Sequence, residues 1–348
     1  MILVFLATYL KIIISVLVIN FCFFGNLFCK DLFSDYREYQ VSNTKLKIKK
    51  VTDGLDFAWG MTFIDKTNLI ITQKNGKLLR VNTQNGKTKV IKHKIDSLHF
   101  DGAGQGGLLD VLYHNGFLYF SYSHDFSLSD SKKHNSGSAT AIAKGQLVND
   151  EIVNLKILLI AKPRSRINKH FGSRLLIKGN HLYASFGERD LGMIAQDASK
   201  HPGSIIRINL DGSIPTNNPA FNKHPDWLPE IFQIGVRNPQ GITISPHDGN
   251  IYISQHGPRG GDNIGKIKHA GNFGWKDVAW GGKEYHGAKI GKEAFKDKYN
   301  DHLITWVPSI GVGQISFYKG KTFKEWDGDL IVSATGAGLL LRLIYKNK

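Results

Sequence analysis

Leu69–Val81 reads LIITQKNGKLLRV, in which two short apolar runs flank the polar residues Gln73–Gly76. Apolar runs joined through an Asn-Gly pair are typical of a β-hairpin, because Asn and Gly tolerate the positive φ angles that a tight turn requires. The segment therefore predicts two antiparallel strands, Leu69–Thr72 and Leu78–Val81.

Both kinds of strand recur along the chain. Runs like the first occur at Phe117–Ser121 (FLYFS), Leu182–Ser185 (LYAS), Ile251–Ser254 (IYIS) and Leu330–Ser333 (LIVS). Runs of the form G-x-Φ-Φ-R-Φ, where Φ is apolar, occur at Gly76–Val81, Gly203–Ile208 and, loosened by one residue, Gly338–Leu343. The 348 residues include 37 glycines, and no convincing amphipathic helix of three or more turns follows the N-terminal segment. Short strands with many tight turns indicate an all-β fold.

Recurring sets of strands without helices are typical of a sandwich, a barrel or a propeller. The body of the chain, taken as residues 40–348, is too long for one sandwich, whereas six blades of roughly 50 residues each account for its length. Two unrelated β domains are the alternative, although no Pro- or Ser-rich linker divides the chain. We therefore expect a single six-bladed β-propeller, with site residues on loops from several blades.

The N-terminal segment is almost continuously apolar from Met1 to Cys29, with Lys11 as its only charge. Residues 1–29 are predicted to be a secretory signal peptide or, alternatively, an uncleaved membrane anchor. Both cysteines lie in this segment, so the body would have neither a disulfide framework nor a Cys-built metal site. We expect a periplasmic or secreted protein, which meets the membrane only through this segment if it is retained.

The net charge of +16 favours anionic partners without identifying them. The basic residues are spread along the chain rather than gathered in one stripe, so we do not expect nucleic-acid binding. The chain contains no G-x-S-x-G, G-x-x-x-x-G-K-[ST] or H-E-x-x-H motif, and no G-x-G-x-x-G between a strand and a helix. Serine hydrolases, P-loop NTPases, zincins and Rossmann dehydrogenases are therefore poor candidates.

Several segments between the predicted strands contain more polar residues than a turn requires. They are DGAGQGGLL around Gln105, HFGSRL starting at His170, GVRNPQG around Arg237 and Asn238, GPRGGDN at Gly257–Asn263 and NFGW at Asn272–Trp275. Taken singly, each has a plain structural interpretation, as a turn or a capping residue. The small residues around Gln105 would also let a ligand approach the backbone closely. Taken together, the order of these segments along the chain favours a functional role over a set of separate turns.

That order resembles the soluble pyrroloquinoline-quinone (PQQ)-dependent aldose sugar dehydrogenases, the glucose/sorbosone dehydrogenase family of six-bladed propellers. The resemblance covers roughly Leu55–Leu343, and R-N-P-Q-G followed about twenty residues later by H-G-P-x-G-G-D is a specific combination. It implies oxidation of an aldose sugar at the anomeric carbon to a lactone. It also implies PQQ and calcium as cofactors and an external electron acceptor.

The resemblance further implies roles for four side chains. His170 matches the general base that takes the proton of the anomeric hydroxyl, and Arg237 matches a residue that contacts the quinone oxygens. Asn238 and Gln105 match other contacts to the cofactor. These residue types suit the roles, because a neutral imidazole accepts a proton and a guanidinium stabilises developing negative charge.

Four further residues resemble ligands of calcium. Gly257 and Pro258 match a segment whose backbone carbonyls hold the ion that polarises the quinone, a role open to neutral residues because calcium accepts carbonyl oxygens. Asn263 and Phe273 fall where some members of the family bind a further calcium ion. Asn263 stands in place of the usual Glu, which keeps an oxygen ligand but removes a charge.

The chain also departs from the family pattern elsewhere. Gly336 stands where the family often has a cofactor-binding Lys, and Lys169 stands where related enzymes can carry an acid. The family continues beyond the position of Lys348 with arginines that meet the cofactor, so the last blade is expected to be incomplete. A degenerate or truncated propeller that binds a sugar or protein partner without catalysis is the alternative function. A metal-dependent propeller lactonase is a third and weaker one.

Overall fold

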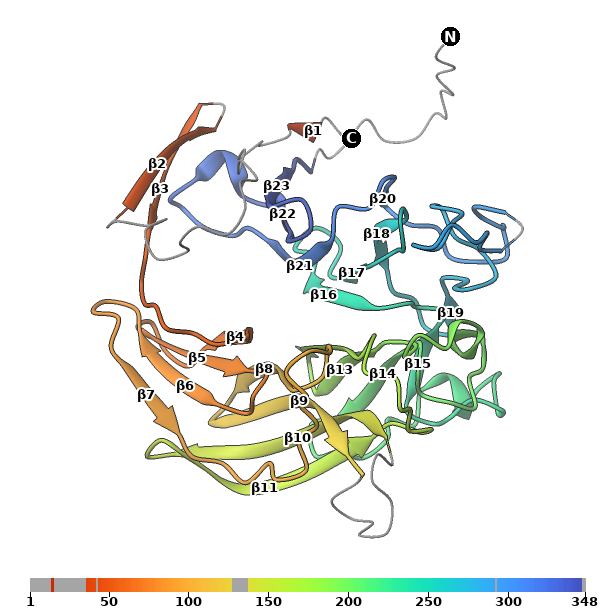
Figure 1. Cartoon of the computed structure of the whole chain (residues 1–348), viewed down its shortest axis with the longest axis horizontal. Helices are drawn as coiled ribbons and strands as arrows, with labels where there is room; N and C mark the ends of the chain where they lie inside the picture. Colours follow the sequence, from red (N-terminus) through yellow and green to blue (C-terminus); the bar gives the residue numbers. More distant parts are fainter. Residues whose placement is uncertain (1–13, 16–35, 42, 127–136, 292, 346–348) are drawn as a thin grey trace.

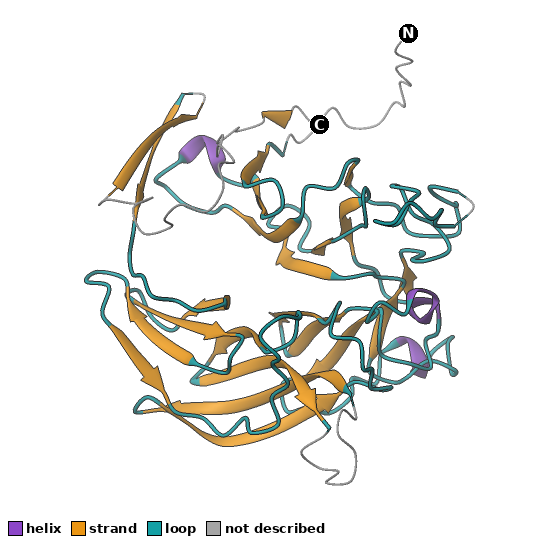
Figure 2. Ribbon diagram, viewed as in Figure 1, coloured by secondary structure: helices purple, strands orange, loops and turns teal. Residues whose placement is uncertain are grey.

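The computed structural model describes residues 14–15, 36–41, 43–126, 137–291 and 293–345. These residues form β-strands, loops and three short 3-10 helices, at Gly192–Gln196, Pro219–Phe221 and Lys324–Trp326. Five sheets surround a common centre as the blades of a β-propeller (Figure 1, Figure 2). The predicted all-β propeller is therefore confirmed.

The blades follow one another in chain order. The first contains β4 (Ala58–Phe63), β5 (Asn68–Gln73), β6 (Leu78–Asn82) and β7 (Thr88–Ile91). The second contains β8 (Leu108–His114), β9 (Phe117–Asp125), β10 (Ser138–Val148) and β11 (Glu151–Ile160). The third contains β12 (Gly172–Lys178), β13 (His181–Phe186), β14 (Ser204–Asn209) and β15 (Ile231–Ile234), with β19 (Gly271–Asn272) added in parallel at its edge.

The last two blades complete the described part of the ring. The fourth contains β16 (Pro239–Ile244), β17 (Ile251–Gln255), β18 (Asp262–Lys266) and β20 (Ile304–Trp306). The fifth contains β21 (Val312–Phe317), β22 (Leu330–Ala334) and β23 (Leu339–Leu343), with β1 (Ile14–Ser15) beside β23. The hairpin predicted from Leu69–Val81 forms β5 and β6, with Leu69 opposite Val81. The other predicted runs lie in β9, β13, β14, β17, β22 and β23.

The hydrophobic core lies between consecutive blades. Ile70 of the first blade and Leu118 of the second belong to one buried cluster, and Ile264 of the fourth and Val332 of the fifth belong to another. Two more clusters join the second blade to the third and the third to the fourth. Because a blade stacked on both sides buries both faces, its strands read as nearly continuous apolar runs. This packing fixes the relative positions of the loops that enter the blades.

The sixth blade stays a prediction, since the described residues form five blades and a separate two-stranded sheet of β2 (Tyr36–Val41) and β3 (Thr44–Lys49). The fifth blade is not left at three strands, because β1 pairs with β23, Ile14 opposite Leu343. β4, in the first blade, has two exposed apolar side chains, since Met61 is 67% exposed and Phe63 is 58% exposed.

The signal peptide or anchor predicted for residues 1–29 lies outside the described residues, except for the two residues of β1. No helix in the described part of the chain has the length and apolar character to cross a bilayer. The signal peptide or membrane anchor therefore stays a prediction.

Candidate functional site

Loops that lead into β8, β12 and β16 meet near the centre of the ring, where these innermost strands lie side by side. The backbone N–H of His170 donates to Oε1 of Gln105 at 2.8 Å, and that of Gly172 donates to Oδ1 of Asn238 at 3.1 Å. The N–H of Glu188 donates to the carbonyl of Arg237 at 2.8 Å. The structure therefore brings together the four residues that the resemblance predicts to act on cofactor and substrate.

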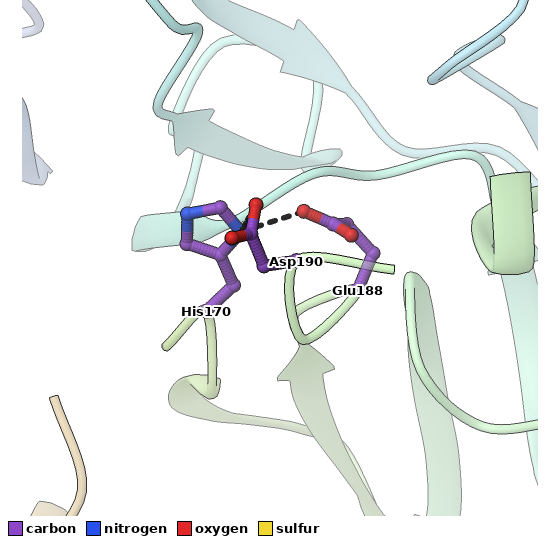
Figure 3. A group of neighbouring side chains, drawn as sticks. All are labelled: His170, Glu188 and Asp190. Atoms are coloured by element: carbon purple, nitrogen blue, oxygen red, sulfur yellow. Dashed lines mark hydrogen bonds and ion pairs between the residues drawn. The ribbon is translucent and has the colours of Figure 1, made fainter. Parts of the chain in front are cut away.

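His170 is paired with a carboxylate that the sequence analysis did not single out (Figure 3). Its Nδ1 lies 2.6 Å from Oε1 of Glu188, and both side chains are buried. The other carboxylate oxygen of Glu188 accepts the N–H of Gly192 at 2.6 Å. Asp190 is more distant, with Oδ1 3.9 Å from Nδ1 of His170, and half of its side chain is exposed. Glu188 is thus the group that orients the imidazole.

The ionisation of Glu188 determines which imidazole nitrogen is free. Burial opposes the charged carboxylate, but the hydrogen bond and charge of His170 and the N–H of Gly192 outweigh it and lower the pKa of Glu188. An ionised carboxylate only accepts hydrogen bonds, so Nδ1 of His170 carries the shared hydrogen. In the neutral form of this imidazole Nε2 has the lone pair, and it makes no hydrogen bond to any described residue. An imidazole in this tautomer can accept a proton.

The loop around His170 is held in a strained conformation. His170 has a φ of 51°, in the left-handed region that side chains other than Gly rarely adopt. Arg189, 2% exposed, stacks on the ring of Phe171 at 3.8 Å and donates to the carbonyls of Lys169 and Ser138, each at 2.9 Å. Burial lowers the pKa of Arg189 to about 10, which leaves it charged at neutral pH. Arg189 therefore holds the backbone just before His170 and packs on the side chain just after it.

A cleft of about 220 Å³ opens beside these groups. It is lined by Trp59, Lys74, Gln105, Leu109, Phe171, Gly172, Asn238, Gln240 and His256. Aromatic faces, side-chain amides and one ammonium group make a lining that suits a flat ligand with polar, anionic edges.

A second, much smaller pocket of about 30 Å³ shares His256 with the cleft. It contains Arg237 and all four predicted calcium ligands, Gly257, Pro258, Asn263 and Phe273. Nη1 of Arg237 donates to the carbonyls of His256 and Gly257, each at 3.3 Å, whereas its Nε is buried without a partner among the described residues. The guanidinium therefore lies under the Gly257–Pro258 turn.

Asp262, the acid of the G-G-D motif, holds this turn in place. Its buried carboxylate accepts the N–H of Gly257 at 2.8 Å and those of Ile310 and Val312 at 3.1 and 2.9 Å. Gly257 is required sterically, because a Cβ at that position would lie 2.4 Å from the carbonyl carbon of Gly261. The motif thus ties the turn after β17 to the start of β21.

The glycines around Gln105 have a different purpose from the one expected. A Cβ on Gly104 would lie 2.1 Å from the side chain of Asn168, and one on Gly106 would lie 2.8 Å from it. Asn168 accepts the N–H of Gly106 through Oδ1 at 3.1 Å, and its carbonyl accepts that of Gln105 at 3.0 Å. The prediction that these small residues admit a ligand was wrong for Gly104 and Gly106, because Asn168 fills the space beside them.

A family model described as glucose/sorbosone dehydrogenase matches residues 55–348. The chain belongs to the glucose/sorbosone dehydrogenase family. The resemblance inferred from the sequence motifs is therefore confirmed. Membership assigns the chain to sugar dehydrogenases, while the roles of individual residues stay predictions.

Known sugar dehydrogenases are similar to the chain in sequence and in structure. The aldose sugar dehydrogenase YliI of Escherichia coli is 31% identical over 296 residues, which are 83% of this chain and 78% of that protein. A crystal structure of a glucose dehydrogenase superimposes with a TM-score of 0.79 at 27% identity, covering 86% of both chains. The PQQ-bound aldose sugar dehydrogenase of Streptomyces coelicolor has a TM-score of 0.68 at 18% identity, covering 86% of this chain and 80% of that one. This last likeness shows the shared fold.

Gly257 and Asn263, two of the four predicted calcium ligands, already accept hydrogen bonds in this structure. The carbonyls of Gly257 and Pro258 are ligands that calcium accepts, but no Asp or Glu among the described residues lines their pocket, so anionic ligands would have to come from the cofactor. At the further site, Oδ1 of Asn263 already accepts from Gln255 at 3.2 Å, and the buried Nε of Arg237 lines the same pocket. A permanent cation and N–H donors are poor neighbours for a second calcium ion, but the carbonyl of Gly257 also accepts from Nη1 of Arg237. All four residues therefore stay predicted ligands.

Four residues of the site lay outside the sequence predictions. Glu188 and Arg189 follow the predicted strand at Leu182–Ser185, and Lys74 lies in the first hairpin turn. His256 stands just before Gly257. Only the charged residues of G-E-R-D, placed directly after an apolar strand, offered a local signal for Glu188.

Proposed function

We propose that this protein oxidises aldose sugars at the anomeric carbon to lactones, with PQQ and calcium as cofactors and an external electron acceptor. The observation that carries the proposal is the buried pair of His170 and Glu188 beside a cleft lined by Gln105 and Asn238. Membership of the sugar dehydrogenase family supports the same reaction class. A periplasmic or secreted location is part of the proposal, since the chain would then meet free sugars.

The residues of the cleft suit a flat, anionic cofactor. Trp59 offers an aromatic face, and Gln105 and Asn238 offer amide donors. The amide of Gln240 already donates to Asn238 and to the carbonyl of Pro239. PQQ, when bound, supplies the two-electron acceptor for the hydride that leaves the anomeric carbon. The carbonyls of Gly257 and Pro258 are the proposed ligands of the calcium ion.

His170 acts as the general base. Its Nε2 accepts the proton of the anomeric hydroxyl, and the imidazolium that forms is stabilised by Glu188 at 2.6 Å from Nδ1. The permanent charge of Arg237 stabilises negative charge that develops near the Gly257 turn. Because Glu188 also accepts the N–H of Gly192, the base is held in one orientation before substrate binds.

The test is a titration of the purified chain with PQQ in the presence and absence of calcium. Sugar-dependent reduction of an artificial electron acceptor should appear only after both are added. A folded sample that remains inactive with every aldose in a panel of hexoses and pentoses would reject the proposal.

His170→Ala separates this function from that of a non-catalytic binding propeller. The enzyme proposal predicts a fall in kcat of at least about 10²-fold, which is typical for the loss of a general base. The variant should retain the circular dichroism spectrum of the wild type. Activity equal to that of the wild type would exclude His170 as the base.

A further inference from the structure

The cleft has one permanent side-chain charge in its lining. Lys74 is the only Lys, Arg, Asp or Glu among the described residues that line it. The lysine that the family often uses for the cofactor is replaced here by Gly336. Lys74 is therefore the one cation that the described lining of the cleft offers to an anionic ligand.

Lys74 is placed firmly at the edge of the cleft. It follows β5, and its backbone is bonded on both sides, through its N–H to the carbonyl of Phe57 and through its carbonyl to the N–H of Leu108, each at 3.1 Å. Its Nζ donates to the carbonyl of Gly104 at 2.6 Å. Gly104 directly precedes Gln105, so the ammonium group is fixed beside a residue that itself lines the cleft.

The ammonium group of Lys74 is only partly satisfied. It carries three N–H donors, and the described residues provide one acceptor, the carbonyl of Gly104. The rings of Phe57 and Phe100 lie 5.7 and 5.6 Å from Nζ. They offer weak cation–π attraction.

Asp101 acts on this charge without forming an ion pair with it. Burial lowers the pKa of Lys74, and the charge of Asp101 opposes the shift. The carboxylate of Asp101 makes no ion pair with Lys74 and instead accepts from Asn168 and from the N–H groups of Ala103 and Gly104. A half-buried cation with two free donors remains beside the cleft.

We propose that Lys74 binds a carboxylate of the planar, anionic cofactor in this cleft and replaces the missing family lysine. This inference rests on the proposed function and adds a residue from the first blade to the cofactor site. A charge-assisted hydrogen bond from Nζ would fix the cofactor's edge against the loop that carries Gln105. The aromatic plane would remain free to lie against Trp59.

The experiment measures PQQ affinity directly, without turnover. The full chain, free of cofactor and in buffer with calcium, is titrated with PQQ by calorimetry or by quenching of tryptophan fluorescence. Lys74→Met should bind about 10- to 100-fold more weakly, the range expected for loss of a hydrogen bond to a charged group. Lys74→Arg keeps the charge and should lose less affinity than Lys74→Met. Lys77→Met, which removes an exposed lysine from the same turn, should bind as the wild type does.

A second measurement uses only the wild-type chain, so it does not depend on the folding of a variant. The trimethyl ester of PQQ keeps the planar ring system but has no carboxylate, and it should bind at least about 10-fold more weakly than PQQ.

The outcomes separate the two proposals. If the wild type does not bind PQQ, the proposed function fails and this inference fails with it. If the wild type binds PQQ but Lys74→Met binds equally well, or the ester binds as tightly as the acid, the role of Lys74 is refuted while the proposed function stands.

Discussion

Replacing Asp262 with asparagine should destabilise the propeller by about 3 kcal/mol. The buried carboxylate accepts three backbone N–H groups from two segments, one from Gly257 and two from the chain that enters β21. Asparagine has a single acceptor oxygen. It can serve Gly257 or the pair of Ile310 and Val312, and its NH₂ group then faces the remaining donors.

The magnitude follows from these contacts. One charge-assisted hydrogen bond is lost, worth about 1.5–3 kcal/mol, and at least one buried N–H is left unsatisfied at a cost of about 1–3 kcal/mol. Partial relaxation of the turn after β17 brings the expected loss to about 3 kcal/mol. In a domain of this size that loss lowers Tm by about 5–10 °C.

The assay is equilibrium unfolding in urea, accompanied by a thermal scan. Asp226→Asn is the matched control, because Asp226 is exposed and its carboxylate makes no hydrogen bond or ion pair among the described residues. The control should change stability by less than about 0.5 kcal/mol. If Asp262→Asn lowers the free energy of unfolding by less than about 0.5 kcal/mol, the conclusion that Asp262 holds the turn in place is refuted.

Two further predictions concern the catalytic pair and the Gln105 loop. Glu188→Gln should lower kcat by about 10²–10⁴-fold, because an amide in place of the carboxylate favours the wrong tautomer of the catalytic histidine. The control Asp190→Asn should lower kcat by less than about 5-fold. Equal losses of kcat in the two variants would contradict the role of Glu188. The N–H of Gly104 and the amide of Asn168 outweigh burial and lower the pKa of Asp101 to about 2. A depressed carboxyl pKa stabilises the fold above about pH 4, and this contribution is lost as the pH falls toward 2. Asp101→Asn should therefore be less stable than the wild type in urea at pH 7 and converge with it on acidification, whereas a gap that stays constant with pH would contradict this reading.

Local sequence determined the strands and most of the candidate residues. The β5–β6 hairpin could be predicted from LIITQKNGKLLRV because two apolar runs and an Asn-Gly pair act over a few neighbouring residues. The motifs around His170, Arg237 and Gly257 could likewise be read in order along the chain and assigned to one family. The number of blades could not be derived so directly, since it depends on how whole sheets pack around a centre.

Tertiary structure alone decided which groups meet. Glu188 reaches His170 because β12 and β13 pair and bring the loops at their ends together, a contact that no spacing along the chain reveals. Likewise Asn168 fills the space beside Gly104 and Gly106, and the guanidinium of Arg237 lines the pocket proposed for a further calcium ion. Hydrogen bonds and charges act through space at a few ångströms, so residues distant in sequence acquire their chemistry only when the blades pack.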